Sequence, residues 1–572
     1  METNRTPPTL GQRCRWVWCL SAMMVGQPAC AQQPSAGFAQ LLRQAEAQSA
    51  AKAWAAAAPL WQQVVAANPV QPRFWQRLGQ AQQRAGQSRE AIRAYEQVVA
   101  LGGPEPEEAA YRAATLYMKL QEPDKALDWL EKSLNLRFGY LTDAQTDSVW
   151  RPLQQNARYR RLVSLVDVRT MSRDEGWRTD LGIFAHEARR RGFAVPRALT
   201  PDQLDAAVQR VAAAVPRLTD VQLYIELRKL TALLGDGHSN IFPSGDRLTA
   251  LRLTLPVQFY QFEEGLFIIA ADPKYRELLG AQVLRFGDKT VPEVAEAMLP
   301  FLSRDNAYWP KQVAPYEMRQ PAVLHALGLQ PSPDHTTLTV KDIRGRTRQV
   351  VLAADASQPN IWNTLPNPST WVNLPQTLAT PLPAYLKRMG EKYWYETLPG
   401  GKVLYFQFNS VRNNDTEPFA RFTERLLQAA ADPQLEKLVV DLRWNNGGNT
   451  YLVPALVAGL QANARLNQAG KLFVLIGRRT FSAAQNTATM LERQTKATFI
   501  GEPTGSSPNF VGEEKPFTLP YSGLSANVSD LYWQTAWPDD HRTWLAPQVY
   551  LPPTFAASRQ NRDLVLEAVL AY

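Results

Sequence analysis

The sequence predicts a multidomain protein in which all-α repeats precede a small mixed domain and an α/β core with a largely parallel sheet. Three observations indicate this order. Helix-forming residues recur at a fixed spacing between residues 38 and 135, strand-like runs broken by turns fill residues 251–355, and strands alternate with helices after residue 396. The chain has 572 residues, 45% of them hydrophobic, which is enough to build several hydrophobic cores.

The first residues have the pattern of a secretory signal peptide. Arg13 and Arg15 precede an apolar run over residues 16–25, and residues 29–31 have the small-x-small form that signal peptidase accepts. A membrane anchor is the alternative, but a bilayer span needs about 20 apolar residues and this run is shorter. We therefore expect residues 1–31 to be removed and the protein to be exported to the periplasm or beyond the cell.

Composition excludes several classes of function. All three cysteines, Cys14, Cys19 and Cys30, lie in the predicted signal peptide, so the mature chain should have neither a cysteine nucleophile nor a zinc-thiolate site. The net charge is +9, but Lys and Arg are interspersed with Asp and Glu, which argues against a nucleic-acid groove. After signal cleavage we expect no stable membrane span.

Residues 36–165 read as helical repeats. Small and large residues recur at a spacing of 34 or 35: Ala57, Ala91 and Ala126, each followed four residues later by Trp61, Tyr95 and Leu130. Small residues let paired helices approach closely, and the large ones fill the gap between neighbouring pairs. This pattern resembles the tetratricopeptide repeat, with an ordinary helical bundle as the alternative. Such a module would hold a protein partner or serve as a spacer.

Residues 173–245 predict a helical domain that ends in the motif Gly-Asp-Gly-His. In its last helix, over residues 221–234, four leucines share one face, and the helix stops just before His238. Residues 251–355 follow as the small mixed domain. Residues 356–395, rich in Pro, Asn, Thr and Ser, predict a connecting segment.

Residues 396–572 predict the α/β core. Strands and helices alternate over residues 402–408, 417–431, 438–442, 452–462, 472–476 and 483–493. In largely parallel sheets of this kind, catalytic groups lie at the carboxyl ends of strands, where loops and helix starts converge.

Two of these strand ends carry unusual loops. The first leads from Asp441 into the pair Gly447-Gly448, and glycines let backbone amides face a ligand closely. The second ends at Ser482, where a helix begins, so that the serine and the amide of Ala483 point the same way. A helix cap is the alternative reading of such a serine.

These motifs together resemble the tail-specific protease family. The resemblance rests on Leu-Gly-Asp-Gly-His-Ser at 234–239, Val-Asp-Leu-Arg-x-Asn-x-Gly-Gly at 440–448, Thr-x-Ser-Ala-Ala at 480–484 and Ile-Gly-Glu-Pro-Thr-Gly at 500–505. Residues 517–524 are similar to the branch that contains the tricorn protease core and interphotoreceptor retinoid-binding protein. The likeness covers roughly residues 175–572 and implies that residues 251–355 form a PDZ-like or derived domain.

The resemblance also implies the site residues. Ser482 matches the nucleophile, and His238 matches the general base of the tricorn branch. Gly447 or Gly448, with the amide of Ala483, match the oxyanion hole. Asp540 is the candidate for the third, acidic group. The resemblance implies no metal and no organic cofactor.

The sequence departs from the family pattern at two positions. Many members use a serine/lysine dyad, and the position of that lysine is Ser507 here. A position that is often Glu is Gln485. The resulting prediction is an exported serine-type endopeptidase that acts on a peptide or protein through an acyl-enzyme on Ser482, with His238 as base. A catalytically silent peptide- or ligand-binding protein on the same fold is the alternative.

Overall fold

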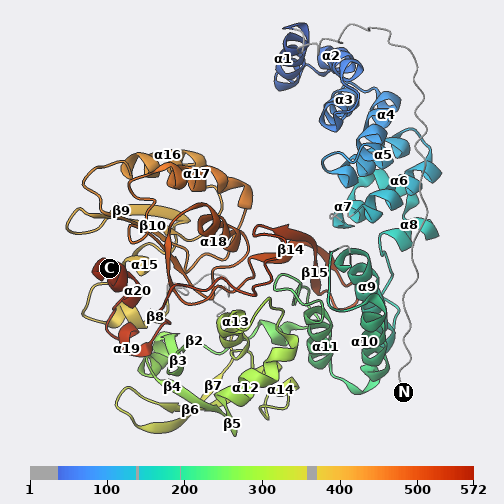
Figure 1. The fold of residues 1–572 in the computed structure, drawn as a ribbon. Helices are drawn as coiled ribbons and strands as arrows, with labels where there is room; N and C mark the ends of the chain where they lie inside the picture. The colour runs from blue at the N-terminus through green and yellow to red at the C-terminus, as the bar shows by residue number, and fades with distance from the viewer. Residues whose placement is uncertain (1–35, 137–140, 194, 357–369) are drawn as a thin grey trace, which may run out of the picture. The chain divides into compact units, whose positions relative to one another are not determined.

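The computed structural model describes residues 36–136, 141–193, 195–356 and 370–572 (Figure 1). The predicted signal peptide, residues 1–31, lies outside the described residues. The chain divides into two compact units at residue 109, within helix α5 (Pro106–Lys119). None of the helices in the described part combines the length and the hydropathy that crossing a membrane requires.

The first unit contains four helices in two hairpins, α1 (Ala36–Ala50) with α2 (Trp54–Ala67) and α3 (Pro72–Arg84) with α4 (Ser88–Ala100). Ala57 and Ala91 are completely buried, and Trp61 and Tyr95 are almost so. A side chain at Gly79 would overlap the Tyr95 ring, with its Cβ only 2.9 Å from Cε1. The small-against-large packing predicted for the repeats is therefore present.

The second unit begins with most of α5 and continues with α6 (Pro123–Asn135), α7 (Leu141–Thr146) and α8 (Ala157–Leu162). Helices α9 (Arg173–Gly192), α10 (Pro201–Ala214) and α11 (Asp220–Ala232) follow. Their apolar faces share one hydrophobic core. The same core takes in a three-stranded antiparallel sheet with the order β1-β15-β14: β1 (Asn240–Phe242), β14 (Asn509–Thr518) and β15 (Ser525–Gln534). Strands from the carboxy-terminal region therefore complete the predicted helical domain.

The mixed domain is built on an antiparallel sheet with the order β2-β3-β4-β6-β7. Its strands are β2 (Val257–Phe262), β3 (Gly265–Ala271), β4 (Gln282–Phe286), β6 (His335–Lys341) and β7 (Thr347–Ala353), with the short β5 (Lys289–Thr290) paired to β4. Helices α12 (Val291–Met298), α13 (Trp309–Glu317) and α14 (Pro321–Ala326) lie between β5 and β6 in the chain. This arrangement agrees with the mixed character predicted for residues 251–355.

The segment predicted as a connection over residues 356–395 is more structured than expected. Strand β8 (Val372–Asn373) pairs with β3, α15 (Ala384–Lys387) follows, and β9 (Tyr393–Thr397) already belongs to the core sheet. The prediction of a plain linker is thus wrong for the part that the structure describes, because elements this short give no hydrophobic period in the sequence.

The core sheet has six strands in the order β16-β13-β12-β11-β10-β9, and only β9 runs antiparallel to its neighbour. The other strands are β10 (Val403–Phe408), β11 (Lys437–Asp441), β12 (Leu472–Ile476), β13 (Thr498–Gly501) and β16 (Val549–Tyr550). The predicted largely parallel sheet is confirmed.

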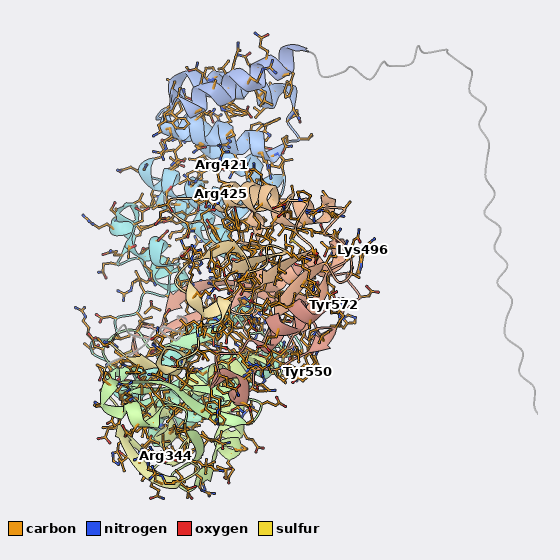
Figure 2. All side chains as sticks on the ribbon, turned by 90° about the vertical axis from the view of Figure 1, so that its left-hand side faces the viewer. Arg344, Arg421, Arg425, Lys496, Tyr550 and Tyr572 are labelled. Atoms are coloured by element: carbon orange, nitrogen blue, oxygen red, sulfur yellow. The ribbon has the colours of Figure 1, made fainter. Side chains whose placement is uncertain are left out.

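Helices cover both faces of this sheet (Figure 1). Helices α16 (Phe419–Ala429), α17 (Pro454–Ala462) and α18 (Ala483–Gln494) pack on one face, against alternate strand residues such as Phe406 and Val474. Helix α20 (Leu564–Ala571) packs on the other face, against Tyr405 and Phe473. The chain ends at Tyr572, labelled in Figure 2, whose ring meets Phe473 edge-on.

Candidate active site

Ser482 lies in the short turn between β12 and α18. Its backbone adopts φ 55° and ψ −127°, a left-handed conformation that costs a residue other than glycine of order 1–3 kcal/mol. Its side chain makes no capping hydrogen bond to the helix that follows it. The alternative reading of Ser482 as a helix cap is therefore not realised, and the hydroxyl is held at a strained strand-to-helix turn.

The glycine pair of the preceding loop lies directly against this turn. Gly447 has φ +109°, and a Cβ at this position would lie 2.6 Å from Ser482 Cβ and 2.8 Å from the amide nitrogen of Ala483. Gly448 has φ +140°, and its Cβ would lie 2.2 Å from the carbonyl oxygen of Val411. Glycine is required at both positions, and at 447 it leaves the space in front of the serine open.

The backbone amides around this turn differ in whether they already have an acceptor. The amide of Gly447 donates to Asn445 Oδ1 at 2.9 Å, so it is already engaged. Among the hydrogen bonds of the described residues, the amides of Gly448 and Ala483 donate to no acceptor. Ala483 opens α18, whose aligned peptide dipoles favour negative charge at this end. These two amides are the available donors for an oxyanion.

His238 is 8% exposed, and neither of its ring nitrogens has a hydrogen-bond partner in the described part of the chain. Burial lowers the pKa of His238 to about 4, although the carboxylate of Asp236 and the backbone of Val511 act in the opposite direction. The imidazole is therefore neutral at pH 7, and no hydrogen bond joins it to Ser482 in this structure.

Aromatic rings enclose the imidazole of His238. Its ring stacks on Phe481 with centroids 4.4 Å apart, and on Phe510 of β14 at 5.2 Å. Phe481 in turn stacks on Trp309 of α13 at 4.1 Å. Since Phe481 immediately precedes Ser482, the histidine lies beside the serine turn, with a ring rather than a hydrogen bond as the contact.

The loop that carries His238 is fixed by a buried ionic network. One carboxylate oxygen of Asp236 accepts the amides of His238 and Ser239, at 2.9 and 2.6 Å. The other forms an ion pair with Arg197, and both of these side chains are 2% exposed. Ser529 of β15 donates to the first oxygen at 3.2 Å. The motif Gly-Asp-Gly-His is therefore tied to the β14–β15 hairpin.

The structure does not bring Asp540 to His238. Its carboxylate bonds to the guanidinium of Arg542 at 2.7–3.2 Å, and this contact holds the pKa of Asp540 below its usual range. Since the imidazole nitrogens have no partner among the described residues, the prediction of Asp540 as the group that orients His238 does not fit the geometry. The resemblance gave only a sequence position for the acidic group, and the Asp540 side chain bonds to a residue of its own loop instead.

Gln485 lies in the first turn of α18 and is completely buried. Its Nε2 donates to Thr489 Oγ1 at 3.1 Å, while its Oε1 has no partner in the described residues. A neutral side chain is suited to this position, because an ionised carboxylate without a cation would be costly in such a site.

A cavity of about 570 Å³, including the open space at its mouth, lies next to the serine turn. Its lining includes Asn446, which precedes the glycine pair, and Trp309, which stacks on Phe481. Phe242, Val313 and Tyr316 add apolar walls. A second cavity, of about 700 Å³, lies at the carboxyl ends of β11, β12 and β13. Neither Ser482 nor His238 is among the lining residues of either cavity.

Sequence reasoning missed several residues of this site. Phe481, Phe510 and Trp309 come from three separate segments, and only Phe481 lies within a motif. Arg197 and Asp305, whose Oδ1 accepts the amide of Gly237 at 2.7 Å, belong to no motif, and no signal in the sequence points to them. No group of three or more His, Cys, Asp or Glu side chains that could hold a metal ion occurs in the described residues.

Two family models match the amino-terminal part of the chain. The model described as bacterial transcriptional activator domain matches residues 21–105, and the model described as tetratricopeptide repeat matches residues 107–140. No curated protein matches the sequence.

Several solved structures resemble the chain. CPAF complexed with lactacystin is 13% identical, covering 70% of this chain and 97% of its own, with a TM-score of 0.48. The photosystem II D1 C-terminal processing protease is 14% identical, covering 67% and 94%, with a TM-score of 0.32. A putative S41 protease from Bacteroides fragilis is 16% identical, covering 59% and 86%, with a TM-score of 0.28. The structural neighbours of the chain thus include peptidases, and its amino-terminal repeats are of the tetratricopeptide type.

Proposed function

We propose that the protein is a serine-type peptidase that cleaves peptide bonds through an acyl-enzyme on Ser482. The observation that carries the proposal is the backbone at Ser482, which is left-handed, makes no capping bond and lies against two glycines. Strain of this kind persists where the surrounding fold imposes it, and it is typical of a nucleophile presented at a strand-to-helix turn.

In the proposed reaction, Ser482 Oγ attacks the carbonyl carbon while His238 accepts the hydroxyl proton. The amides of Gly448 and Ala483 donate to the oxyanion of the tetrahedral intermediate. His238 then returns the proton to the leaving amine, and water releases the acyl group by the reverse sequence. The cavity beside Asn446 and Trp309 would accept a substrate side chain next to the cleaved bond.

The proposal requires one movement. His238 contacts Phe481 and Phe510 rather than Ser482, so the Phe481 ring has to leave the stack before the imidazole reaches the hydroxyl. An imidazole with a pKa near 4 is also a weak base at neutral pH, and opening of the stack would raise that pKa by admitting water.

The aromatic stack around His238 supports a second candidate function, a catalytically silent protein that binds a peptide. If the aromatic stack is permanent, His238 serves only as a packed core residue and the cavity beside Trp309 is a binding site.

Labelling with a fluorophosphonate probe, located by mass spectrometry, separates the two. The peptidase proposal expects labelling at Ser482 that is lost in Ser482→Ala and His238→Ala and kept in Ser172→Ala. The Ser172 variant is the matched control, because Ser172 also begins a helix but does cap it, accepting the amide of Glu175. Folded protein that takes no label at Ser482 would establish the binding-protein candidate instead.

We also propose that the protein is exported and that its repeats hold a protein partner. The basic and apolar leader supports export, and the tetratricopeptide match supports the partner. Intact mass measurement on protein purified from its native cells tests export: a mature chain that begins at Gln32 is expected, and a chain that retains residues 1–31 would contradict it.

A further inference from the structure

Asp305 joins the His238 loop to another loop of the site. It lies between Phe301 and α13, in the predicted mixed domain, and is half-buried. Its Oδ1 accepts the amide of Gly237 at 2.7 Å, and its Oδ2 accepts the hydroxyl of Ser506, in the loop after β13. One carboxyl group therefore bridges two segments that are more than 250 residues apart in the sequence.

The next residue strengthens this connection. Asn306 Nδ2 donates to the carbonyl oxygens of Thr504 and Thr543, at 3.1 and 2.7 Å. Asn306 Oδ1 accepts the amide of Trp309, at 3.3 Å, where α13 begins. The pair therefore also sets the start of the helix whose Trp309 stacks on Phe481.

Gly237 lies between this carboxyl and the aromatic stack. A Cβ at Gly237 would lie 2.9 Å from the Phe481 ring and 3.4 Å from Asp305 Oδ1. Because the ring nitrogens of His238 have no hydrogen-bond partner in the described structure, the position of the ring depends on the aromatic stack and on how the backbone of this loop is held. Asp236 holds one side of the loop, and Asp305 holds the other.

We propose that Asp305 is a positioning residue of the peptidase site: it sets the His238 loop against the loop after β13. That the site is a peptidase site rests on the proposed function. The positioning concerns the loop alone.

The surroundings of Asp305 favour its neutral form. Burial raises the pKa of Asp305 to about 7, with hydrogen bonds from Ser506 and the amides of Gly237 and Ser507 acting against it. The charged group that faces it is the Asp236 carboxylate, which raises the pKa further. The neighbouring Arg304 turns away and donates to the carbonyl oxygens of Leu299 and Leu302.

Three variants test the proposal. Asp305→Asn keeps an acceptor for Gly237 and a partner for Ser506 but cannot ionise, whereas Asp305→Ala removes both contacts. Asp180→Asn is the matched control, because Asp180 is also a buried carboxyl that accepts two backbone amides, those of Tyr521 and Ser522.

Hydrogen exchange of residues 235–240 measures positioning without any need for activity. Asp305→Ala is expected to raise exchange of this loop about tenfold, equivalent to roughly 1.4 kcal/mol of local stability, while Asp305→Asn and Asp180→Asn leave it near wild type. Unchanged exchange in Asp305→Ala would overturn the positioning role, whatever the protein catalyses.

Fluorophosphonate labelling measures whether the positioned loop belongs to a reactive site. Asp305→Ala is expected to label about tenfold more slowly than wild type, because His238 is no longer held in place, while the conservative Asp305→Asn and the control Asp180→Asn label at nearly the wild-type rate. Wild-type labelling in Asp305→Ala would overturn a role of Asp305 in the peptidase site. If wild type takes no label at all, the proposed function fails, and the exchange measurement still decides the positioning.

Discussion

Two loops of the site place an aspartate beside an arginine, yet they differ in how completely their polar groups are paired. In the loop at 441–448, Arg443 bonds to both Asp441 and Asp563, and Asn445 uses both ends of its side chain. In the loop at 235–239, Asp236 is paired but the two ring nitrogens of His238 have no partner in the described chain. Saturated polar networks specify a structure, whereas an unsatisfied buried group points to function.

Breaking the saturated loop should have the largest effect on stability. Arg443→Ala leaves Asp441, which is completely buried, and Asp563, which is 8% exposed, without their cation. Removing one partner from such a network costs about 3–5 kcal/mol. The measurement is the midpoint of urea unfolding, followed by hydrogen exchange of β11.

The control for this prediction is Arg421→Ala. Arg421, labelled on α16 in Figure 2, has a 76% exposed side chain and a surface ion pair with Glu424. Such a pair contributes about 0–1 kcal/mol. An Arg443 variant no less stable than the Arg421 variant would show that the two loops do not differ in the way described.

Removing the unpaired ring should change how stability depends on pH. Because the pKa of His238 falls from 6.5 to about 4 on folding, the unfolded chain binds a proton between these values that the folded chain does not. Wild type should therefore lose about 3 kcal/mol relative to His238→Gln as pH falls from 7 to 4. Urea midpoints at both pH values check this. The pKa of Asp305 rises on folding, so this group favours the folded state as pH falls. It does so in both proteins, and its contribution cancels from the difference between them.

If the difference in unfolding free energy between the two proteins is the same at pH 7 and pH 4, the imidazole is solvated. The two loops would then not differ in how completely their polar groups are paired.

Asp540→Asn should have the smallest effect. The Asp540 carboxylate bonds to Arg542, whose side chain is 46% exposed, so the change should cost no more than about 1 kcal/mol. Fluorophosphonate labelling should stay within about twofold of wild type. A tenfold slower reaction would return Asp540 to the site as the third catalytic group.

The core strands were predictable from sequence because buried strands form continuous apolar runs. Residues 472–476 are one such run, and they form β12 with the predicted bounds. The two-residue strand β8 carries no such signal, so residues 356–395 looked like a connection. The hairpin β14–β15 was also missed as strands, since its residues pack partly on helices from the other end of the chain.

The candidate site was predictable only as far as local motifs reach. The left-handed backbone at Ser482 and the approach of Gly447 follow from motif and topology together. The enclosure of His238 by Phe481 and Phe510, and the bridge made by Asp305, are tertiary contacts between distant segments. Such contacts leave no hydrophobic period or motif spacing in the sequence, because each partner looks like an ordinary core or loop residue within its own segment.

The strained backbone at Ser482 also bears on how this chain is maintained. Glycine adopts φ 55° without penalty. A glycine usually lowers stability, because it gives the unfolded chain more conformational freedom. At position 482 the relief of backbone strain should outweigh that cost, so that Ser482→Gly is more stable than the wild type. Selection for stability alone would therefore not keep a serine at this position. The proposed role of its hydroxyl would explain a serine that is kept at a cost to the fold, since activity and stability are traded against each other at functional positions.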